Sequence, residues 1–187
     1  TQRISLNFPI TSSEWSKYAV IVDVYVPEGV ADEISLKTTN GEISVQGLSP
    51  QELMIDTTNG RVTLMDVASS IIQVETTNGA ITGTFTSSST SFHTTNGGIE
   101  MTLGTASGEH QFSTTNGSID LSLPTGSNVG YSIDLDTSVG VIGVNLPNMS
   151  YDVDKVRTKN GETVGYDAKE IQISISADTA IGSIDLN

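Results

Sequence analysis

The stretch TTNGEISV at residues 38–45 contains the motif that decides the fold. Thr-Thr-Asn-Gly occurs five times, and the copies end at Gly41, Gly60, Gly79, Gly97 and Gly117. Three degenerate copies follow at residues 137–140, 158–161 and 179–182. The glycines that end consecutive copies lie 18 to 23 residues apart. A repeat of this length is typical of stacked supersecondary units.

Apolar residues alternate with polar ones on both sides of each copy. The position five residues before the glycine is apolar in the first seven copies, and the position two residues after it is apolar in all but one of the eight. Each unit is therefore predicted to be a short strand, an Asn-Gly turn and a second strand. Glycine suits such a turn because it tolerates positive φ.

Two all-β architectures fit this pattern. Asn-Gly between strands usually indicates a hairpin, which would give a hairpin-based sandwich. Recurrence of one turn with the same flanks favours stacked coils, because like positions then lie on like positions. We predict a single-domain, right-handed β-solenoid of 7–8 coils with a period of 19–21 residues. Residues 34–187 would form the coils, and residues 1–33, with a strongly alternating strand at 18–26, would form an N-terminal cap.

The first Thr and the Asn of each copy have inward parity at the predicted corner. Coils stack about 4.8 Å apart, so these hydroxyls and amides can hydrogen-bond from coil to coil. The second Thr should face solvent in a single file. We interpret the motif as structural rather than ligand-binding, and the predicted ladder comprises Thr38, Asn40, Thr57, Asn59, Thr76, Asn78, Thr94, Asn96, Thr114 and Asn116.

Composition limits the classes of function. The 187 residues carry 22 acidic and 8 basic side chains, for a net charge of −14. This charge repels phosphate backbones and argues against nucleic-acid binding. There is no Cys, hence no disulfide or thiolate site. No apolar run approaches the roughly 20 residues of a membrane span. Because the chain opens at Thr1 rather than Met, we expect that a signal or anchor has been trimmed.

Candidates for catalysis and metal binding are few. The sequence contains no Gly-x-Ser-x-Gly, no His-Glu-x-x-His and no phosphate-cradling loop, and no catalytic residue or organic cofactor is predicted. Parity places His93 outward and His110 inward in different columns, which argues against shared metal ligation. Glu100 and Asp120 share one column in adjacent coils. Their repulsion would be relieved by a hard cation such as Ca²⁺, so they are the calcium candidates. The dense Asp/Gly repeats of calcium-binding solenoids are missing.

The sequence resembles a known family at its motifs. A strand that ends in Val-Pro-Glu-Gly at residues 26–29, followed by Thr-x-Asn-Gly-x-Ile-x-Val units, is similar to the DUF4097 family, whose members carry the label adhesin. The turn Leu-Pro-Thr-Gly at residues 123–126 fits as well, and the resemblance covers about residues 18–187. It implies a β-helix-like fold and an extracytoplasmic or cell-surface location. It brings no catalytic residues.

These features lead us to expect a non-enzymatic, cell-surface, adhesin-like binding or spacer domain with a glycan or protein partner. The alternative is a self-assembling scaffold of the cell envelope, in which coil ends stack between molecules. Two further alternatives are weaker. A polysaccharide-cleaving enzyme needs acids that converge in a groove, and the basic residues are too scattered to complete one. An ice-binding protein needs two Thr files on a flat face, where the sequence predicts one.

Overall fold

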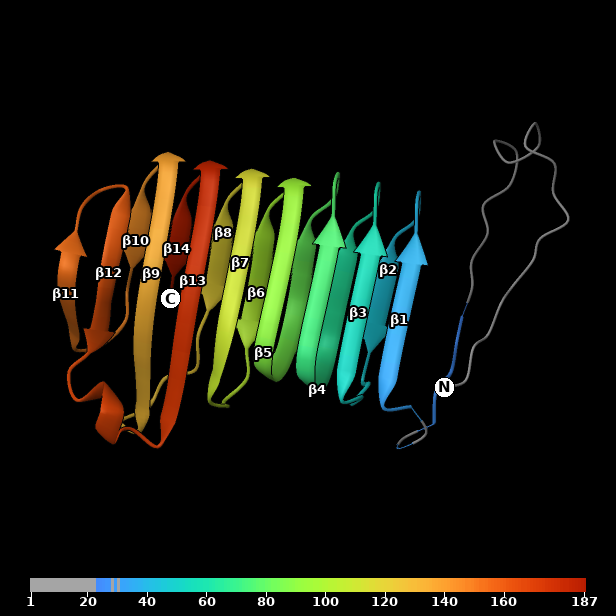
Figure 1. The fold of residues 1–187 in the computed structure, drawn as a ribbon, viewed down its shortest axis with the longest axis horizontal. Coiled ribbons are helices and arrows are strands. Elements are labelled where there is room, and N and C mark those ends of the chain that lie inside the picture. The colour runs from blue at the N-terminus through green and yellow to red at the C-terminus, as the bar shows by residue number, and fades with distance from the viewer. Residues whose placement is uncertain (1–22, 28, 30) are drawn as a thin grey trace, which may run out of the picture.

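The chain folds into an all-β, solenoid-like stack (Figure 1). The computed structural model describes residues 23–27, 29 and 31–187. No α-helix occurs among them, and a 3₁₀ turn, η2 (Tyr166–Ala168), precedes β13. The strands are β1 (Glu33–Thr38), β2 (Ile43–Gln46), β3 (Glu52–Thr57), β4 (Val62–Thr76), β5 (Ile81–Asn96), β6 (Ile99–Leu103), β7 (Gly108–Asn116), β8 (Ile119–Ser122), β9 (Val129–Val139), β10 (Ile142–Val144), β11 (Met149–Asp154), β12 (Thr158–Thr163), β13 (Ile171–Ile181) and β14 (Ile184–Leu186).

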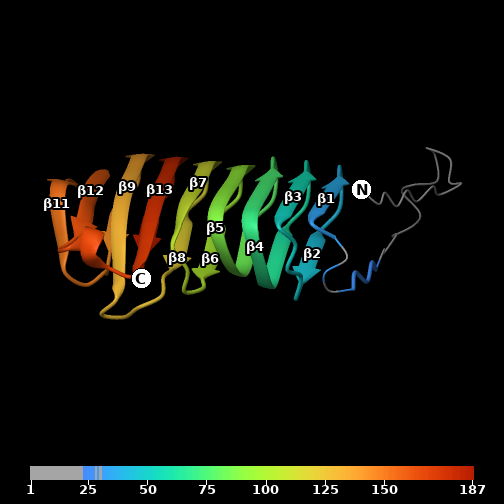
Figure 2. The ribbon, with the colours of Figure 1, turned by 60° about the horizontal axis from the view of Figure 1, so that its bottom comes forward.

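The strands form two walls that share their longest members. The long wall has the order β11-β12-β9-β13-β7-β5-β4-β3-β1, and the short wall has the order β10-β14-β8-β6-β5-β4-β2. β4 and β5 belong to both walls because they bend from one to the other (Figure 2). The bend in β4 falls at Asp66, which has a φ of 54°, and the register with β5 shifts between Leu64 and Val67.

Neighbouring coils pair in parallel and in register, so stacking rather than hairpins builds the repeat. The first Thr of one copy pairs with the first Thr of the next, as in Thr57 with Thr76 and Thr94 with Thr114. Alternation turns one face of each strand into the space between the walls. Ile99 there pairs with Ile81 and Ile119, and all three are completely buried. Burial of such aliphatic columns is the main favourable contribution to the stability of the stack.

The order of strands departs from the order of the chain at one place. β13 pairs in parallel with β7 on one side and with β9 on the other. β14 likewise lies between β8 and β10. Figure 1 shows β13, in red, between the yellow β7 and the orange β9. The coil formed by residues 171–186 is therefore inserted between two coils that precede it in the sequence.

The copy at residues 158–161 does not form a corner, and the prediction of a coil there is wrong. These residues lie in β12, which pairs antiparallel with both β9 and β11. Val156, which aligns with the inward apolar column, is exposed. The hairpin of β11 and β12 covers the end of the long wall. An antiparallel strand cannot continue the one-way winding of the coils.

The N-terminal cap lies mostly outside the described residues. Of the strand predicted at residues 18–26, residues 18–22 are not described. Residues 23–26 are described and do not belong to a strand, which corrects that part of the prediction. Tyr25 is 92% exposed, so its side chain covers no part of the first coil.

Candidate functional site: the corner ladders and the outer faces of the walls

The first Thr is buried and joins two coils in six of the eight copies. The Thr94 hydroxyl donates a 2.8 Å hydrogen bond to the carbonyl oxygen of Gly79, and Thr114 donates one of 2.9 Å to that of Gly97. Thr57, Thr76, Thr137 and Thr179 repeat this bond, while Thr38 stands in the first coil of the file and is half-buried. A buried hydroxyl thus finds its partner in the neighbouring coil, which meets the requirement that buried polar groups be paired.

The Asn residues form a ladder of their own on the outside of the corner, which we call the corner ladder or, for its amide groups, the amide ladder. Each side-chain amide donates to the Oδ1 of the Asn in the coil before it, at 2.7 to 2.9 Å. The ladder comprises Asn40, Asn59, Asn78, Asn96 and Asn116, and all five are exposed. The inward orientation predicted for Asn is therefore wrong. The exposed Thr precedes it, and the chain is already turning, so the two-residue alternation of a strand no longer applies.

The glycine of the motif is required by close approach rather than by positive φ. A Cβ placed on Gly79 would lie 1.9 Å from the carbonyl oxygen of Gly60. The same clash, at 1.9 to 2.0 Å, would occur at Gly60, Gly97 and Gly117. None of the five motif glycines has a positive φ, contrary to the expectation for an Asn-Gly turn. Gly41 is the exception to the clash, because its nearest neighbour would be Thr38 Oγ1 at 3.2 Å.

The calcium candidates lie side by side on the outer face of the short wall. Glu100 pairs with Asp120, and Asp120 pairs on its other side with Asp185 of the inserted coil. Burial, followed by the charges of Asp185 and Glu100, raises the pKa of Asp120 above its usual value. No group of three or more acidic or imidazole side chains among the described residues is arranged to hold a metal ion.

The two histidines have separate environments. His110 is buried beside Phe85, and its Nδ1 lies 3.0 Å from the hydroxyl of Thr90. Burial lowers the pKa of His110 to about 4, so the ring is neutral near pH 7. His93 is half-buried on the outer face of the long wall, with its Nδ1 2.7 Å from the Oγ of Ser113. Inward His110 and outward His93 match the parity of their strands.

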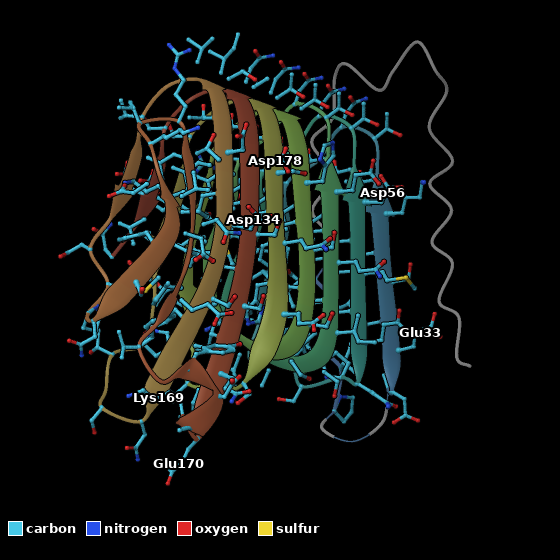
Figure 3. The ribbon with its side chains drawn as sticks, turned by 60° about the vertical axis from the view of Figure 1, so that its left-hand side comes forward. Glu33, Asp56, Asp134, Lys169, Glu170 and Asp178 are labelled. Carbon is cyan, nitrogen blue, oxygen red and sulfur yellow. The ribbon has the colours of Figure 1, made fainter. Side chains whose placement is uncertain are left out.

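The outer face of the long wall carries rows of polar side chains. One row runs across paired strands from Lys37 through Asp56 and Glu75 to His93, and Lys37 and Asp56 form an ion pair. Figure 3 shows such rows side by side over this face, with Asp134 and Asp178 in its central part.

A shallow depression lies in this face over β5, β7 and β13. It is lined by Ser91, Gln111, Ser113, Ser176 and Asp178. Burial raises the pKa of Asp178, and Asp136 on the neighbouring strand raises it further, whereas His93 lowers it. The depression places short hydroxyl side chains next to a carboxylate and an amide. Sequence reasoning missed it because the depression needs the inserted strand β13.

An apolar cluster interrupts the corner at the far end of the stack. In the two coils after Asn116, the ladder position is occupied by Ile181 and Val139, which are 55% and 56% exposed. Val141 and Val156 are exposed nearby, and the carbonyl of Val156 accepts a hydrogen bond from the N–H of Ile142. We call these four residues the corner apolar cluster. It ends the amide ladder.

One comparison with known proteins agrees with the family resemblance of the sequence. The model of the family described as Toastrack DUF4097 matches residues 22–187. No curated protein and no solved structure matches the chain. Among the described residues, no helix is long and apolar enough to span a membrane.

Proposed function

The chain belongs to the Toastrack DUF4097 family, and we propose that it is a non-enzymatic binding domain whose binding surface is the outer face of the long wall. One observation carries this proposal. The in-register stacking of coils places polar side chains in rows on that face, around the depression lined by Ser91, Gln111, Ser113, Ser176 and Asp178. The proposal includes a right-handed winding with seven coils, since the copy at residues 158–161 is not a corner.

The chemistry of the depression favours a ligand rich in hydroxyl or ammonium groups. Ser, Gln and Asp side chains supply donors and acceptors that match sugar hydroxyls, and the net charge of −14 favours a cationic partner over an anionic one. A surface glycan that carries amino groups combines both features. The cell-surface setting implied by the family resemblance belongs to the same proposal.

A catalytic role receives less support from this face. Glycoside hydrolysis by two carboxyl groups needs one on each side of the scissile bond. Asp178 and Asp136 instead lie on neighbouring strands and point from one face of the same wall. The Oγ of Ser113 lies within hydrogen-bond distance of Nδ1 of His93. Asp178 is on the strand at the opposite side of Ser113 from His93. A nucleophilic triad needs the imidazole between the hydroxyl and the carboxylate.

The self-assembling alternative requires the two ends of the stack to be complementary. The long wall ends in an antiparallel hairpin whose pairing is irregular between Tyr151 and Val153. Such irregularities protect an edge strand from further pairing. The corner ladder also ends, because Ile181 and Val139 occupy its position in the last two coils. An Asn side chain of a second molecule stacked on this end would therefore have no amide oxygen to donate to. These features make end-to-end stacking the weaker candidate.

Glycan-array screening with and without Ca²⁺ tests the proposal. We expect binding to amino-containing glycans that is lost in the variant Ser176→Tyr, because the new ring fills the depression. The matched control is Ser122→Tyr, which places the same ring at an exposed site on the short wall. The proposal is contradicted if no glycan binds, or if both variants lose binding equally. Binding that needs Ca²⁺ and survives Ser176→Tyr would favour the column of Glu100 and Asp120 instead.

A further inference from the structure

Six Asn-Gly pairs in this chain share one local chemistry but have different environments. The backbone nitrogen of a glycine that follows Asn can attack the side-chain Cγ. An N–Cγ bond forms, the Cγ–Nδ2 bond breaks, and the proton of the glycine N–H leaves with the amide as ammonia. Water then opens the succinimide to aspartate or isoaspartate. The pairs begin at Asn40, Asn59, Asn78, Asn96, Asn116 and Asn160. Because the next residue is glycine in all six, their environments must decide their relative rates.

The corner ladder restrains the side-chain amides unequally. Asn59, Asn78 and Asn96 each donate to one neighbour and accept from the other. Asn116 only donates, and Asn40 only accepts, among the described residues. The leaving nitrogen of Asn40 is thus the one ladder nitrogen that, within the described part of the chain, has no hydrogen-bond partner. An unrestrained amide can turn its Cγ toward the attacking nitrogen.

The attacking nitrogens are also unequal. The N–H of Gly97 donates to the carbonyl of Asn116 at 3.1 Å, and the N–H of Gly117 donates to that of Ile181 at 2.9 Å. The N–H groups of Gly41, Gly60 and Gly79 donate no hydrogen bond to any described residue. Succinimide formation removes this proton, so a hydrogen bond on it opposes the reaction.

The sixth pair is enclosed in the sheet. Asn160 and Gly161 lie in β12, between β9 and β11, and Gly161 is buried. Their backbone is held on both sides by strand pairing. The reaction would require local opening of the end hairpin, so Asn160 is expected to react slowly.

We propose that Asn40 is a site of spontaneous deamidation, that the ladder protects the pairs at Asn59, Asn78, Asn96 and Asn116, and that strand pairing protects the pair at Asn160. Asn40 must break one hydrogen bond before it reacts, whereas Asn59, Asn78 and Asn116 must break two and Asn96 three. Each such bond slows the reaction by about fivefold. Asn40 should therefore react about fivefold faster than Asn59, Asn78 and Asn116, and about 25-fold faster than Asn96.

The fold accommodates an aspartate at position 40. The Oδ1 of Asn40 accepts from Nδ2 of Asn59 at 2.7 Å, and a carboxylate accepts that bond more strongly than an amide does. In the other ladder residues the side-chain nitrogen is a donor, so an aspartate there would break a bond. Deamidation of Asn40 to aspartate adds a negative charge at the N-terminal end of the ladder without removing a contact.

Peptide mapping by mass spectrometry tests this proposal. The full chain is incubated in mildly alkaline buffer, with and without urea, and the deamidated fraction of each Asn-Gly pair is followed over time. We expect Asn40 to react first in the folded protein and all six pairs to react at similar rates in urea. The proposal fails if Asn40 does not react ahead of the other five in the folded protein. It also fails if the same order persists in urea, because local sequence would then explain it.

Two variants separate the ladder from the chemistry. Gly41→Ala hinders the attacking nitrogen. The new methyl group meets only the side chain of Thr38, whose Oγ1 would lie 3.2 Å away, so the variant should slow deamidation of Asn40 in an intact fold. Asn59→Ala removes the remaining hydrogen bond of Asn40 and should accelerate its reaction by about fivefold. An unchanged rate in Asn59→Ala would overturn the protective role of the ladder.

Discussion

The hydroxyl of Thr179 donates a 2.9 Å hydrogen bond to the carbonyl oxygen of Gly117, which lies 62 residues earlier in the chain. The next bond in the same file runs from Thr137 to Gly182 at 2.8 Å. On both of its sides, the inserted coil is therefore joined by the same Thr-to-Gly hydrogen bond that joins sequential coils elsewhere. The hydrogen bonds at the corner are therefore the same whether or not the two coils are consecutive in the sequence.

Substitution of a central motif glycine should be far more harmful than substitution of the first. In Gly79→Ala the new methyl group would lie 1.9 Å from the carbonyl oxygen of Gly60, which forces the two coils apart. We expect a loss of about 3 kcal/mol in the free energy of unfolding, measured by urea denaturation. Gly41→Ala is the control and should lose less than about 1 kcal/mol. Equal losses would show that flexibility, rather than close approach, selects glycine here.

The repeat, the inward apolar columns and the buried Thr file could be predicted from the sequence. In-register stacking places each residue next to a residue of the same type in the neighbouring coil, so the pattern recurs along the chain. It did not allow the insertion of residues 171–186 to be predicted. Their motif fits a coil that follows β12 equally well as a coil between β7 and β9. The pattern shows which side chains point inward, but it does not show which strand lies next to which. Only the three-dimensional arrangement brings Asp185 beside Asp120 and Asp178 beside Ser113.

The outward orientation of the Asn side chains, and the close approach that requires the motif glycines, could not be predicted from the sequence pattern either. Alternation predicts the side-chain direction only within an extended strand, and at Asn78 the chain has begun to turn. The letters Asn-Gly are the same whether glycine is needed for positive φ or for close packing. The clash at Gly79 depends on the neighbouring coil, which local sequence does not describe.

Removal of the Thr179 hydroxyl should weaken the anchoring of the inserted coil. Thr179→Val keeps the shape of the buried side chain but leaves the half-buried carbonyl of Gly117 without this donor. We expect a loss of about 1–3 kcal/mol in the free energy of unfolding, measured by chemical denaturation. Thr115→Val, at the exposed second Thr of a motif, is the matched control and should change stability by less than about 0.5 kcal/mol. A loss no larger than the control would refute the anchoring role.

Stability should fall in mild acid because of His110. Its pKa in the folded chain is about 4, below the 6.5 of a free imidazole, so the unfolded chain binds a proton more readily. The stabilisation is complete above pH 6.5 and is lost as the pH falls to about 4, by about 3 kcal/mol in total. Denaturation at several pH values measures this slope. His110→Leu should flatten it over that window, and an unchanged slope would exclude His110 as its source.

Neutralising Asp120 should stabilise the short wall. Its raised pKa means that the folded chain disfavours the carboxylate, so Asp120 contributes stability at low pH that is lost as the pH rises through the raised pKa. At neutral pH, Asp120→Asn should raise the free energy of unfolding by up to about 1 kcal/mol, and less in high salt. Asp56→Asn, which removes the partner of Lys37, is the control and should not stabilise the protein. A stabilised control would point to net charge rather than to the column.

Extension of the amide ladder into the inserted coil should be favourable. Ile181 occupies the ladder position next to Asn116 and is 55% exposed, so Ile181→Asn sacrifices little burial. The new amide can donate to the free Oδ1 of Asn116, as each earlier Asn donates to its neighbour, with a gain of about 1 kcal/mol. Val164→Asn, at a site 66% exposed and outside the ladder, is the control for the loss of a surface aliphatic group. We expect thermal denaturation to show a higher midpoint for Ile181→Asn than for Val164→Asn. The reverse order would mean that the corner apolar cluster stabilises the chain through contacts among its own side chains.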